Sequence, residues 1–248
     1  MNTAVAKLAD SLDAASGPRF GQAQLVSLTL LACQIAASTV ANAADALTSG
    51  DPRLYEMVSQ CEEQLDKLDR EIDERVTSAV VGAPAEQVRE LLTCMKMMTD
   101  LERVGDLVSS FAGRARAVGT RLEMQDVADL AKMASVLEQM LQNIFRCLSG
   151  RDLETAIQVL RVDSEIDRLR NLLFIRHVEG QEGVAQESVQ VLFMAQALER
   201  AGDHAKNLAE EVCHLLSGHT LRHVLRSHDQ PFEQMFLRWL RSQQPQST

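Results

Sequence analysis

The sequence predicts an all-α protein made of two tandem, similar three-helix bundles, and three observations carry this prediction. Helix breakers are scarce, with twelve Gly and five Pro among 248 residues. Aromatic residues, which favour strands, make up only 4% of the chain. Apolar residues recur at steps of three and four almost throughout, as they do on one face of an α-helix.

Six long helices are expected because the apolar pattern is interrupted at a few Gly, Ser-Gly and Gly-Pro positions. These breaks lie at Ser49-Gly50-Asp51-Pro52, Gly82-Ala83-Pro84, Gly119, Ser149-Gly150, 180–183 and Ser217-Gly218. The helices are therefore expected to cover residues 20–48, 52–80, 85–117, 124–148, 152–178 and 185–217.

The first expected helix carries no charged residue from Phe20 to Ala44, which is long enough to cross a bilayer. Gln, Ser and Thr interrupt it, and many of its apolar residues are Ala, so we expect a buried helix and no membrane insertion. The chain starts without a basic segment followed by an apolar one, so no signal peptide is expected. The five cysteines lack metal-finger spacing and are expected to be reduced core thiols in a cytoplasmic protein.

The second set of three helices repeats the first. Helices one and four end in Leu47-Thr48-Ser49-Gly50 and Cys147-Leu148-Ser149-Gly150. Helices three and six contain Leu101-Glu102-Arg103-Val104-Gly105-Asp106 and Leu198-Glu199-Arg200-Ala201-Gly202-Asp203, which agree at five of six positions. The repeat predicts one bundle over residues 1–120 and a second over 121–220.

Residues 221–248 form a C-terminal tail with a short amphipathic stretch, in which Phe232, Phe236, Trp239 and Leu240 share one face of an expected helix. This stretch is expected to pack back on the bundle. Docking to a partner or to a membrane surface is the alternative.

Helices two, three, five and six each carry an acidic residue followed four residues later by Asp. Side chains at this spacing lie on one helix face, and like charges there destabilise the helix unless a cation sits between them. If the second and third helices of each unit are antiparallel neighbours, four carboxylates converge in each unit. The first set is Glu62, Asp66, Glu102 and Asp106, and the second is Asp163, Asp167, Glu199 and Asp203.

Carboxylate oxygens suit Mg²⁺, Mn²⁺ or iron better than a metal that prefers thiolates. The alternative is that these acids are solvated and paired with Arg103, Arg168 or Arg200. Their recurrence at equivalent positions of two repeats favours metal ligation. In helices three and six the second acid directly follows a glycine, Gly105 or Gly202. Another backbone or a ligand is expected to come close at these glycines.

The segment from Leu198 to Val212, with the pattern LERxGDHAxNxAEEV, resembles the C-terminal signature of PhoU proteins, and the residues from Leu101 to Leu107 resemble a weaker version of it. The resemblance covers residues 18–224. It implies two three-helix bundles that bind metal clusters through the same eight acids. It departs around Ser109-Ser110-Phe111, so the second unit is expected to be the stronger metal site.

The resemblance further implies a cytoplasmic negative regulator of bacterial phosphate uptake and phosphate-responsive signalling. The implied cofactors are divalent or trivalent metal ions, bound singly or as multinuclear clusters, with iron first and Mn, Mg or Zn as alternatives. The implied partners are the ATPase of the phosphate ABC transporter and a membrane sensor kinase, and a homodimer is expected.

Other functions are less well supported by the sequence. The net charge of −10 disfavours nucleic acid as a partner. The chain lacks a phosphate-binding glycine motif, and Glu211-x-x-His214 is its single match to a di-iron oxidase motif. No Ser or Cys has a His partner that the sequence can identify, so we expect no enzyme. A metal-dependent enzyme, a metal-storage bundle and a structural repeat without metal are kept as alternatives.

Overall fold

The computed structural model describes residues 22–162, 164–178 and 186–218, and its elements in this part of the chain are helical. The expected first three helices are α2 (Gln22–Ser49), α3 (Pro52–Ala79) and α4 (Ala85–Val118), followed by a 3₁₀ turn, η1 (Gly119–Arg121). The second set is α5 (Met124–Gly150), α6 (Leu153–Val162), α7 (Ser164–Val178) and α8 (Gln186–Ser217). The all-α prediction is confirmed, and the expected helix 152–178 corresponds to α6 and α7.

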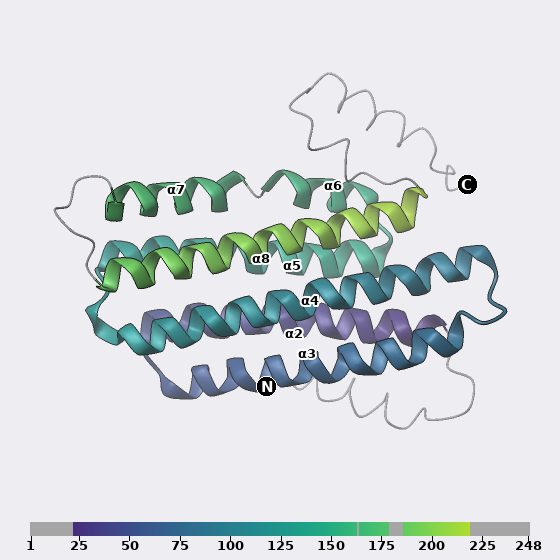
Figure 1. The fold of residues 1–248 in the computed structure, drawn as a ribbon. Helices are drawn as coiled ribbons and strands as arrows, with labels where there is room; N and C mark the ends of the chain where they lie inside the picture. Colours follow the sequence, from purple (N-terminus) through teal and green to yellow (C-terminus); the bar gives the residue numbers. More distant parts are fainter. Residues whose placement is uncertain (1–21, 163, 179–185, 219–248) are drawn as a thin grey trace, which may run out of the picture.

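The helices lie side by side in four layers, as Figure 1 shows. Helices α2 and α4 pack against α5 and α8, with the α2–α5 and α4–α8 contacts joining the two units. Helix α3 covers α2 and α4 on one outer side, while α6 and α7 cover α5 and α8 on the other. The acidic pair on α3 and Asp167 on α7 therefore lie on opposite sides of the molecule.

The break between the first two helices of each unit sets the register of the repeat. Asp51 and Asp152 begin the next helix in their units, because their carboxylates accept hydrogen bonds from the amides of Arg53 and Glu154. The preceding residue adopts a left-handed conformation, at Gly50 with φ 70° and at Arg151 with φ 51°. Gly50 is thus equivalent to Arg151. The sequence match of Ser49-Gly50 with Ser149-Gly150 had paired Gly50 with Gly150, one residue earlier.

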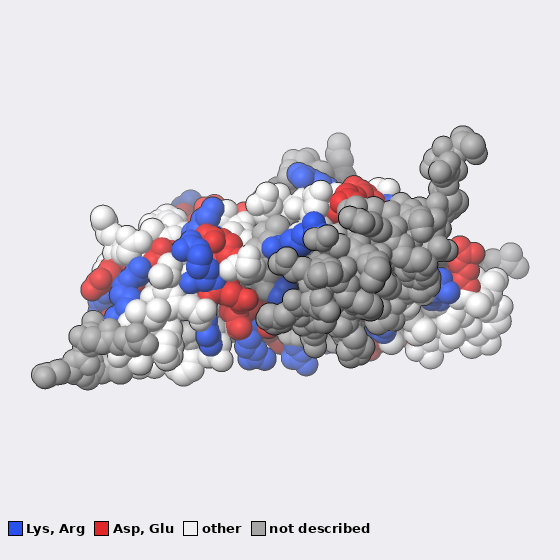
Figure 2. All heavy atoms as spheres, turned by 90° about the horizontal axis from the view of Figure 1, so that it is seen from above, with Lys and Arg blue, Asp and Glu red and all other residues white. Residues whose placement is uncertain are grey.

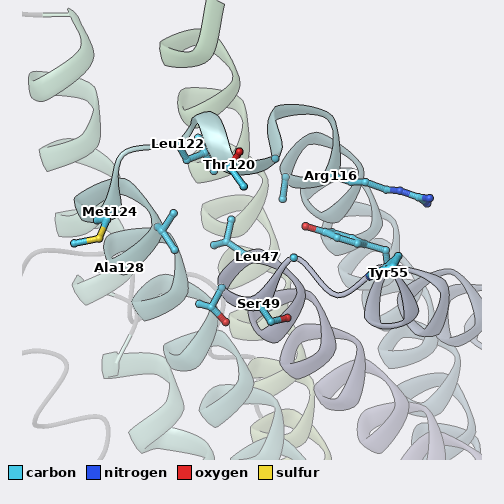
Figure 3. A pocket seen from close by; sticks show the side chains of 14 residues that line it. Leu47, Ser49, Tyr55, Arg116, Thr120, Leu122, Met124 and Ala128 are labelled. Carbon is cyan, nitrogen blue, oxygen red and sulfur yellow. The ribbon is translucent and has the colours of Figure 1, made fainter.

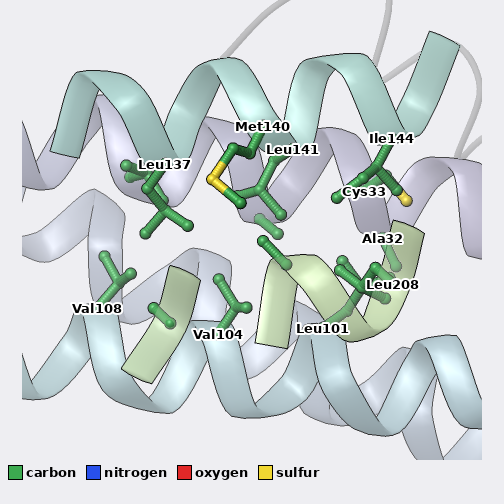
Figure 4. Close-up of a cluster of buried hydrophobic side chains, with 14 of the residues drawn as sticks. Ala32, Cys33, Leu101, Val104, Val108, Leu137, Met140, Leu141, Ile144 and Leu208 are labelled. Atoms are coloured by element: carbon green, nitrogen blue, oxygen red, sulfur yellow. The ribbon is translucent and has the colours of Figure 1, made fainter. Parts of the chain in front are cut away.

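One hydrophobic core runs through both units. Figure 4 shows Ala32 and Cys33 of α2, Leu101 and Val104 of α4, Met140 of α5 and Leu208 of α8 meeting in it. These side chains are at most 1% exposed. The sequence predicted two bundles, and the structure shows that they share a continuous apolar interior. The boundaries at residues 120 and 220 stay predictions, and the tail at 221–248 lies outside the described residues.

Helix α2 is a core helix although it is apolar enough to cross a membrane. The segment Gln24–Ser49 meets that criterion, and 61% of its most apolar window is buried within the protein. Its polar side chains are accommodated locally, since the hydroxyls of Thr29 and Thr39 donate to the carbonyls of Leu25 and Ile35. All five cysteines are free thiols; four are buried, and Cys61 is half-buried.

Candidate metal centre

The α3–α4 pair brings the four predicted acids of the first unit to one seam. Glu62 and Asp66 lie on α3 and Glu102 and Asp106 on α4, and all four are half-buried. Leu65 packs against Gly105, where a Cβ atom would lie only 2.7 Å from Leu65 Cδ1. A close approach does occur at this glycine, but the side chain of Leu65 makes it, where another backbone or a ligand was expected.

The carboxylates in this seam repel one another. The pKa of Glu62 is raised, chiefly by burial and then by the charges of Asp66 and Asp106. The pKa of Glu102 is also raised by burial and by Asp106, and Arg103 partly offsets this rise. A nearby cation would lower the free energy of these carboxylates in their ionised form. This supports the prediction that the four acids bind a cation.

A fifth carboxylate, Asp69, joins the seam. It lies three residues after Asp66 on the same face of α3 and is half-buried. Its pKa is raised by burial first and then by Asp73 and Asp66, while Arg103 lowers it. The sequence analysis did not single out Asp69, although Asp69 and Asp73 are also an acid followed four residues later by Asp on the same helix.

Arg103 is an exposed cation that pairs with both predicted acids of its own helix. Its Nε lies 3.5 Å from Glu102 Oε2, and its Nη1 donates to Asp106 Oδ2 at 3.3 Å. The alternative, in which the acids are paired with arginine, therefore holds for Glu102 and Asp106. Within residues 22–162, 164–178 and 186–218, no three His, Cys, Asp or Glu side chains form a ready-made metal site.

In the second unit the acids are less buried. Asp167 on α7 and Asp203 on α8 are exposed, Glu199 on α8 is half-buried, and Asp163 lies outside the described residues. The pKa of Glu199 is raised by burial and then by Asp203, with Asp167 adding to the rise and Arg170 opposing it. Arg170 was missed by the sequence analysis, although the repeat places it at the position of Asp69.

Basic side chains are interspersed with the acids on this side of the molecule. Arg168 makes two contacts of 2.7 Å with Glu165, and Lys206 Nζ lies 3.9 Å from Asp203 Oδ1. Figure 2, which views the α6–α7 side, shows blue and red side chains mixed over the described surface. The second unit thus presents a mixed charged surface at the predicted ligands.

The donor set of both seams consists of carboxylate oxygens, which fit a hard cation such as Mg²⁺, Mn²⁺ or iron. The half-buried position of Glu62, Glu102 and Glu199 leaves at least part of each side chain open to solvent, so a hydrated ion could approach. A bound cation would supply positive charge that neutralises the repelling carboxylates and draws α3 to α4, or α7 to α8.

A buried polar cluster that the sequence analysis did not identify joins α5, α7 and α8. His177 contacts Ser188 Oγ through Nδ1 at 2.9 Å and Asp126 Oδ1 through Nε2 at 3.0 Å. Arg176 donates to Asp126 and Asp129 at 2.6 Å each. Ser188 and Asp126 are 5% and 1% exposed. This Ser-His-Asp arrangement is buried and shares its aspartate with an arginine, so it fixes the ends of three helices.

Two histidines of α8 make contacts within or between the units, in line with a structural role. His204 Nδ1 lies 2.7 Å from Asp100 Oδ1 on α4. His214 lies 4.0 Å from Glu211, whose carboxylate binds Lys96 of α4 at 3.2 Å. Glu211 of the Glu211-x-x-His214 match is thereby paired with a lysine of α4. His219, His223 and His228 lie outside the described residues.

A pocket of about 740 Å³ lies at one end of the bundle, away from the acids. It is formed where α2 ends, α3 begins, α4 ends and α5 begins, and Figure 3 shows Leu47, Leu122 and Ala128 around it. Arg116 carries the one charge among its lining side chains and lies 5.9 Å from the ring centroid of Tyr55. None of the eight predicted acids lines it.

Comparison with known proteins identifies the repeated unit. The family model described as "PhoU domain" matches residues 30–115 and 130–212. A "Phosphate-specific transport system accessory protein PhoU homolog" from Xylella fastidiosa is 28% identical over 199 residues, which cover 79% of this chain and 83% of that protein.

Two solved structures share the fold. The crystal structure of PhoU from Pseudomonas aeruginosa has a TM-score of 0.72 and 26% identity, and the match covers 79% of this chain and 96% of that one. PhoU from Streptococcus pneumoniae, described as a phosphate transport system regulatory protein, has a TM-score of 0.73 at 20% identity, covering 80% and 96%.

Proposed function

Because the chain belongs to the PhoU family, we propose that it is a cytoplasmic accessory and regulatory protein of a bacterial phosphate transport system. It acts by binding other proteins: the ATPase of the phosphate ABC transporter and the sensor kinase that controls phosphate genes. It works as a homodimer and represses phosphate-starvation genes when phosphate is plentiful. The observation that carries this proposal is the family match across both repeats.

We further propose that the acidic seams bind metal ions, with iron first and manganese, magnesium or zinc as alternatives. The supporting observation is the mutual repulsion of Glu62, Glu102 and their neighbours at the α3–α4 seam. Each seam joins two helices of one unit, so an ion bound there would hold those helices at a fixed separation. Metal loading would in this way set the shape of the outer surfaces that partners contact.

A non-catalytic role agrees with the site chemistry of the described residues. The buried Ser188 hydroxyl faces His177 and lies in the interior at 5% exposure, where a substrate would not reach it. We therefore propose that the protein transmits a signal by binding other proteins and not by catalysing a reaction.

The experiment that tests the regulatory proposal is deletion of the gene in a strain carrying a phosphate-starvation reporter. In rich phosphate the deletion should switch the reporter on, and the wild-type gene should restore repression. The matched pair for the metal proposal is Asp106→Ala with Asp203→Ala against Glu56→Ala, an exposed acid of α3 outside the seam. The first should lose both metal, measured by elemental analysis, and repression. The Glu56 variant should keep both.

The two parts of the proposal fail separately. A reporter that stays off in the deletion strain would refute the regulatory function. A wild-type protein that is purified without chelator and carries no metal would refute the metal sites alone. Repression by the seam variant at wild-type strength would show that metal, if bound, does not control the output.

A further inference from the structure

The pocket at the end of the bundle is suited to an apolar group. Its volume of about 740 Å³ is in the range of pockets that hold ligands or the anchoring side chains of partners. Leu47, Leu122 and Val127 supply apolar walls. Met124 also lines the pocket and is 88% exposed, and methionine is a flexible side chain that adapts to apolar groups of different shape. The pocket thus combines an apolar interior with an adaptable edge.

A guanidinium without an acidic partner stands at this pocket. Arg116 is exposed and lies over the ring of Tyr55, as Figure 3 shows. The hydroxyl of Tyr55 donates to the carbonyl of Ala46 at 3.1 Å, which holds the ring in place. In the described part of the chain no acid forms an ion pair with Arg116. A guanidinium beside an apolar pocket favours a ligand in which an apolar group is accompanied by a carboxylate.

A second arginine of α4 is also bound to neutral groups. Arg114 Nη1 donates to Gln190 Oε1 at 2.9 Å, and its guanidinium lies 4.5 Å from the ring centroid of Phe193. Phe193 and Val189, one turn apart on α8, are exposed apolar side chains. Because Arg114 and Arg116 are two residues apart, they lie on different sides of α4. Each unit therefore presents an arginine on an aromatic ring at this end of the bundle.

The local charge here is opposite to that of the whole chain. Residues 107–122 contain three arginines and no acidic residue, although the net charge of the protein is −10. Arg121 is paired with Glu187 at 3.4 Å, which leaves Arg114 and Arg116 without an acid. An acidic partner would be attracted to this end and repelled by much of the remaining surface, so charge would orient its approach.

The two ends of the chain leave from the other end of the bundle. Helix α2 finishes at the pocket, and α8 begins near it because Glu187 pairs with Arg121. With its 32 residues α8 carries the chain about 48 Å away. From Gly218 to Phe232 there are fourteen residues, which reach at most about 50 Å when fully extended. The apolar tail residues could therefore return to the pocket only on a taut chain, so another molecule is the better occupant.

We infer that this end of the bundle is a docking surface for an acidic, amphipathic segment of a partner protein. The segment places an apolar side chain in the pocket and carboxylates on Arg116 and Arg114. This inference rests on the proposed function, which acts by binding other proteins, and it names the surface and the chemistry of the partner. The pocket is bounded by α2, α3 and α4 of the first unit and α5 of the second, so a bound segment contacts both units.

A membrane surface is the less favoured occupant. Anionic lipid headgroups repel a chain of net charge −10, and a smooth bilayer surface does not fill a concave pocket. A protruding side chain of a protein fills such a pocket, as anchoring residues do at other protein–protein interfaces.

The direct test uses a fluorescein-labelled synthetic helix of about 18 residues, or five turns, with Leu and Phe on one face and Asp and Glu on the other. Binding to the full chain is followed by fluorescence anisotropy. The peptide should bind and shift the methyl resonance of Met124, which is assigned with Met124→Leu. Arg116→Glu should weaken binding at least about tenfold because it replaces an attraction by a repulsion.

A second variant tests the pocket independently of charge. Thr120 is exposed and lines the pocket, so Thr120→Trp fills it without disturbing the core and should also weaken binding at least about tenfold. The matched control is Arg146→Glu, which makes the same charge change on an exposed arginine that binds the neutral Asn143 at the far end of α5. It should leave peptide affinity within about twofold. Melting temperatures of all variants confirm that they are folded.

The phosphate-starvation reporter connects the docking surface to the proposed function. In rich phosphate Arg116→Glu and Thr120→Trp should switch the reporter on at wild-type protein levels, and Arg146→Glu should keep it off. A reporter that stays off in the deletion strain would remove the regulatory proposal, and peptide binding would then decide the inference alone. Weakened binding with full repression would overturn the claim that this surface serves regulation.

Three results would overturn the inference while the regulatory proposal stands on the deletion strain. The first is an acidic peptide that does not bind the wild-type chain. The second is unchanged affinity in both Arg116→Glu and Thr120→Trp. The third is sedimentation of the wild-type chain with phosphatidylglycerol vesicles that Arg116→Glu abolishes, which would identify a membrane as the occupant.

Discussion

Replacing Gly105 by Ala probes the contact that sets the α3–α4 seam. A Cβ atom at this position would lie 2.7 Å from Cδ1 of Leu65, which is 1% exposed. Since carbon atoms prefer about 3.5–4.0 Å, Leu65 would have to retreat by about 1 Å in a packed interior.

Two effects compete in this variant. Gly to Ala inside a helix gains about 1 kcal/mol from backbone propensity. Forcing a methyl group into a packed core costs about 1–3 kcal/mol. Gly113, on the same helix, is exposed, and a Cβ there meets no atom within 4 Å, so Gly113→Ala should show the gain alone. We therefore expect Gly105→Ala to be about 1–3 kcal/mol less stable than Gly113→Ala.

The assay is urea unfolding of the two single variants and the wild type, followed by circular dichroism. For a chain of this length a difference of 1 kcal/mol moves the melting temperature by about 2–4 °C, so calorimetry provides a second measurement. Combining Gly105→Ala with Leu65→Ala should remove the steric term and give a favourable coupling energy in a double-mutant cycle. Equal stabilisation by Gly105→Ala and Gly113→Ala would refute the close packing of this seam.

Two further predictions concern charged groups. Asp126→Ala should lower the free energy of unfolding by about 3–5 kcal/mol in urea titrations, because the buried His177 loses its acceptor and the half-buried Arg176 loses one of its two; a loss below 1 kcal/mol would contradict the role given to this cluster. The pKa values of Glu62 and Glu102 are raised in the folded protein. The stability that these two groups contribute is thus present below the pKa of a glutamate in the unfolded chain, and it is lost as the pH rises through their raised pKa values. The metal-free protein should accordingly gain stability from these two groups as pH falls from neutral through that range, and Glu62→Gln with Glu102→Gln should flatten the dependence measured by urea unfolding.

Much of the helix arrangement could be read from the sequence because each helix signals its own ends and its own buried face. Asp51 and Pro52 begin α3 where the Ser-Gly-Asp-Pro break was found. The apolar residues Val58, Leu65 and Ile72, which recur every seven residues along α3, are all buried. Capping chemistry and apolar period are local properties, so one chain segment is enough to show them.

The members of the seam could be predicted only in part. Glu62, Asp66, Glu102 and Asp106 were found because an i,i+4 spacing fixes the face of a single helix. Which acids stand opposite each other depends on how one helix slides along the next. The contact of Leu65 with Gly105 fixes this register for α3 and α4. Spacing within one helix carries no information about that register.

The sequence by itself determined that this is a repeated helical protein of the PhoU family, with acids at equivalent positions of both units. Tertiary structure alone decided that the units share one core and that Ser188, His177 and Asp126 meet in the interior. The physical reason is that periodicity and motifs are properties of neighbours along the chain. Packing, desolvation and charge pairing depend on neighbours in space.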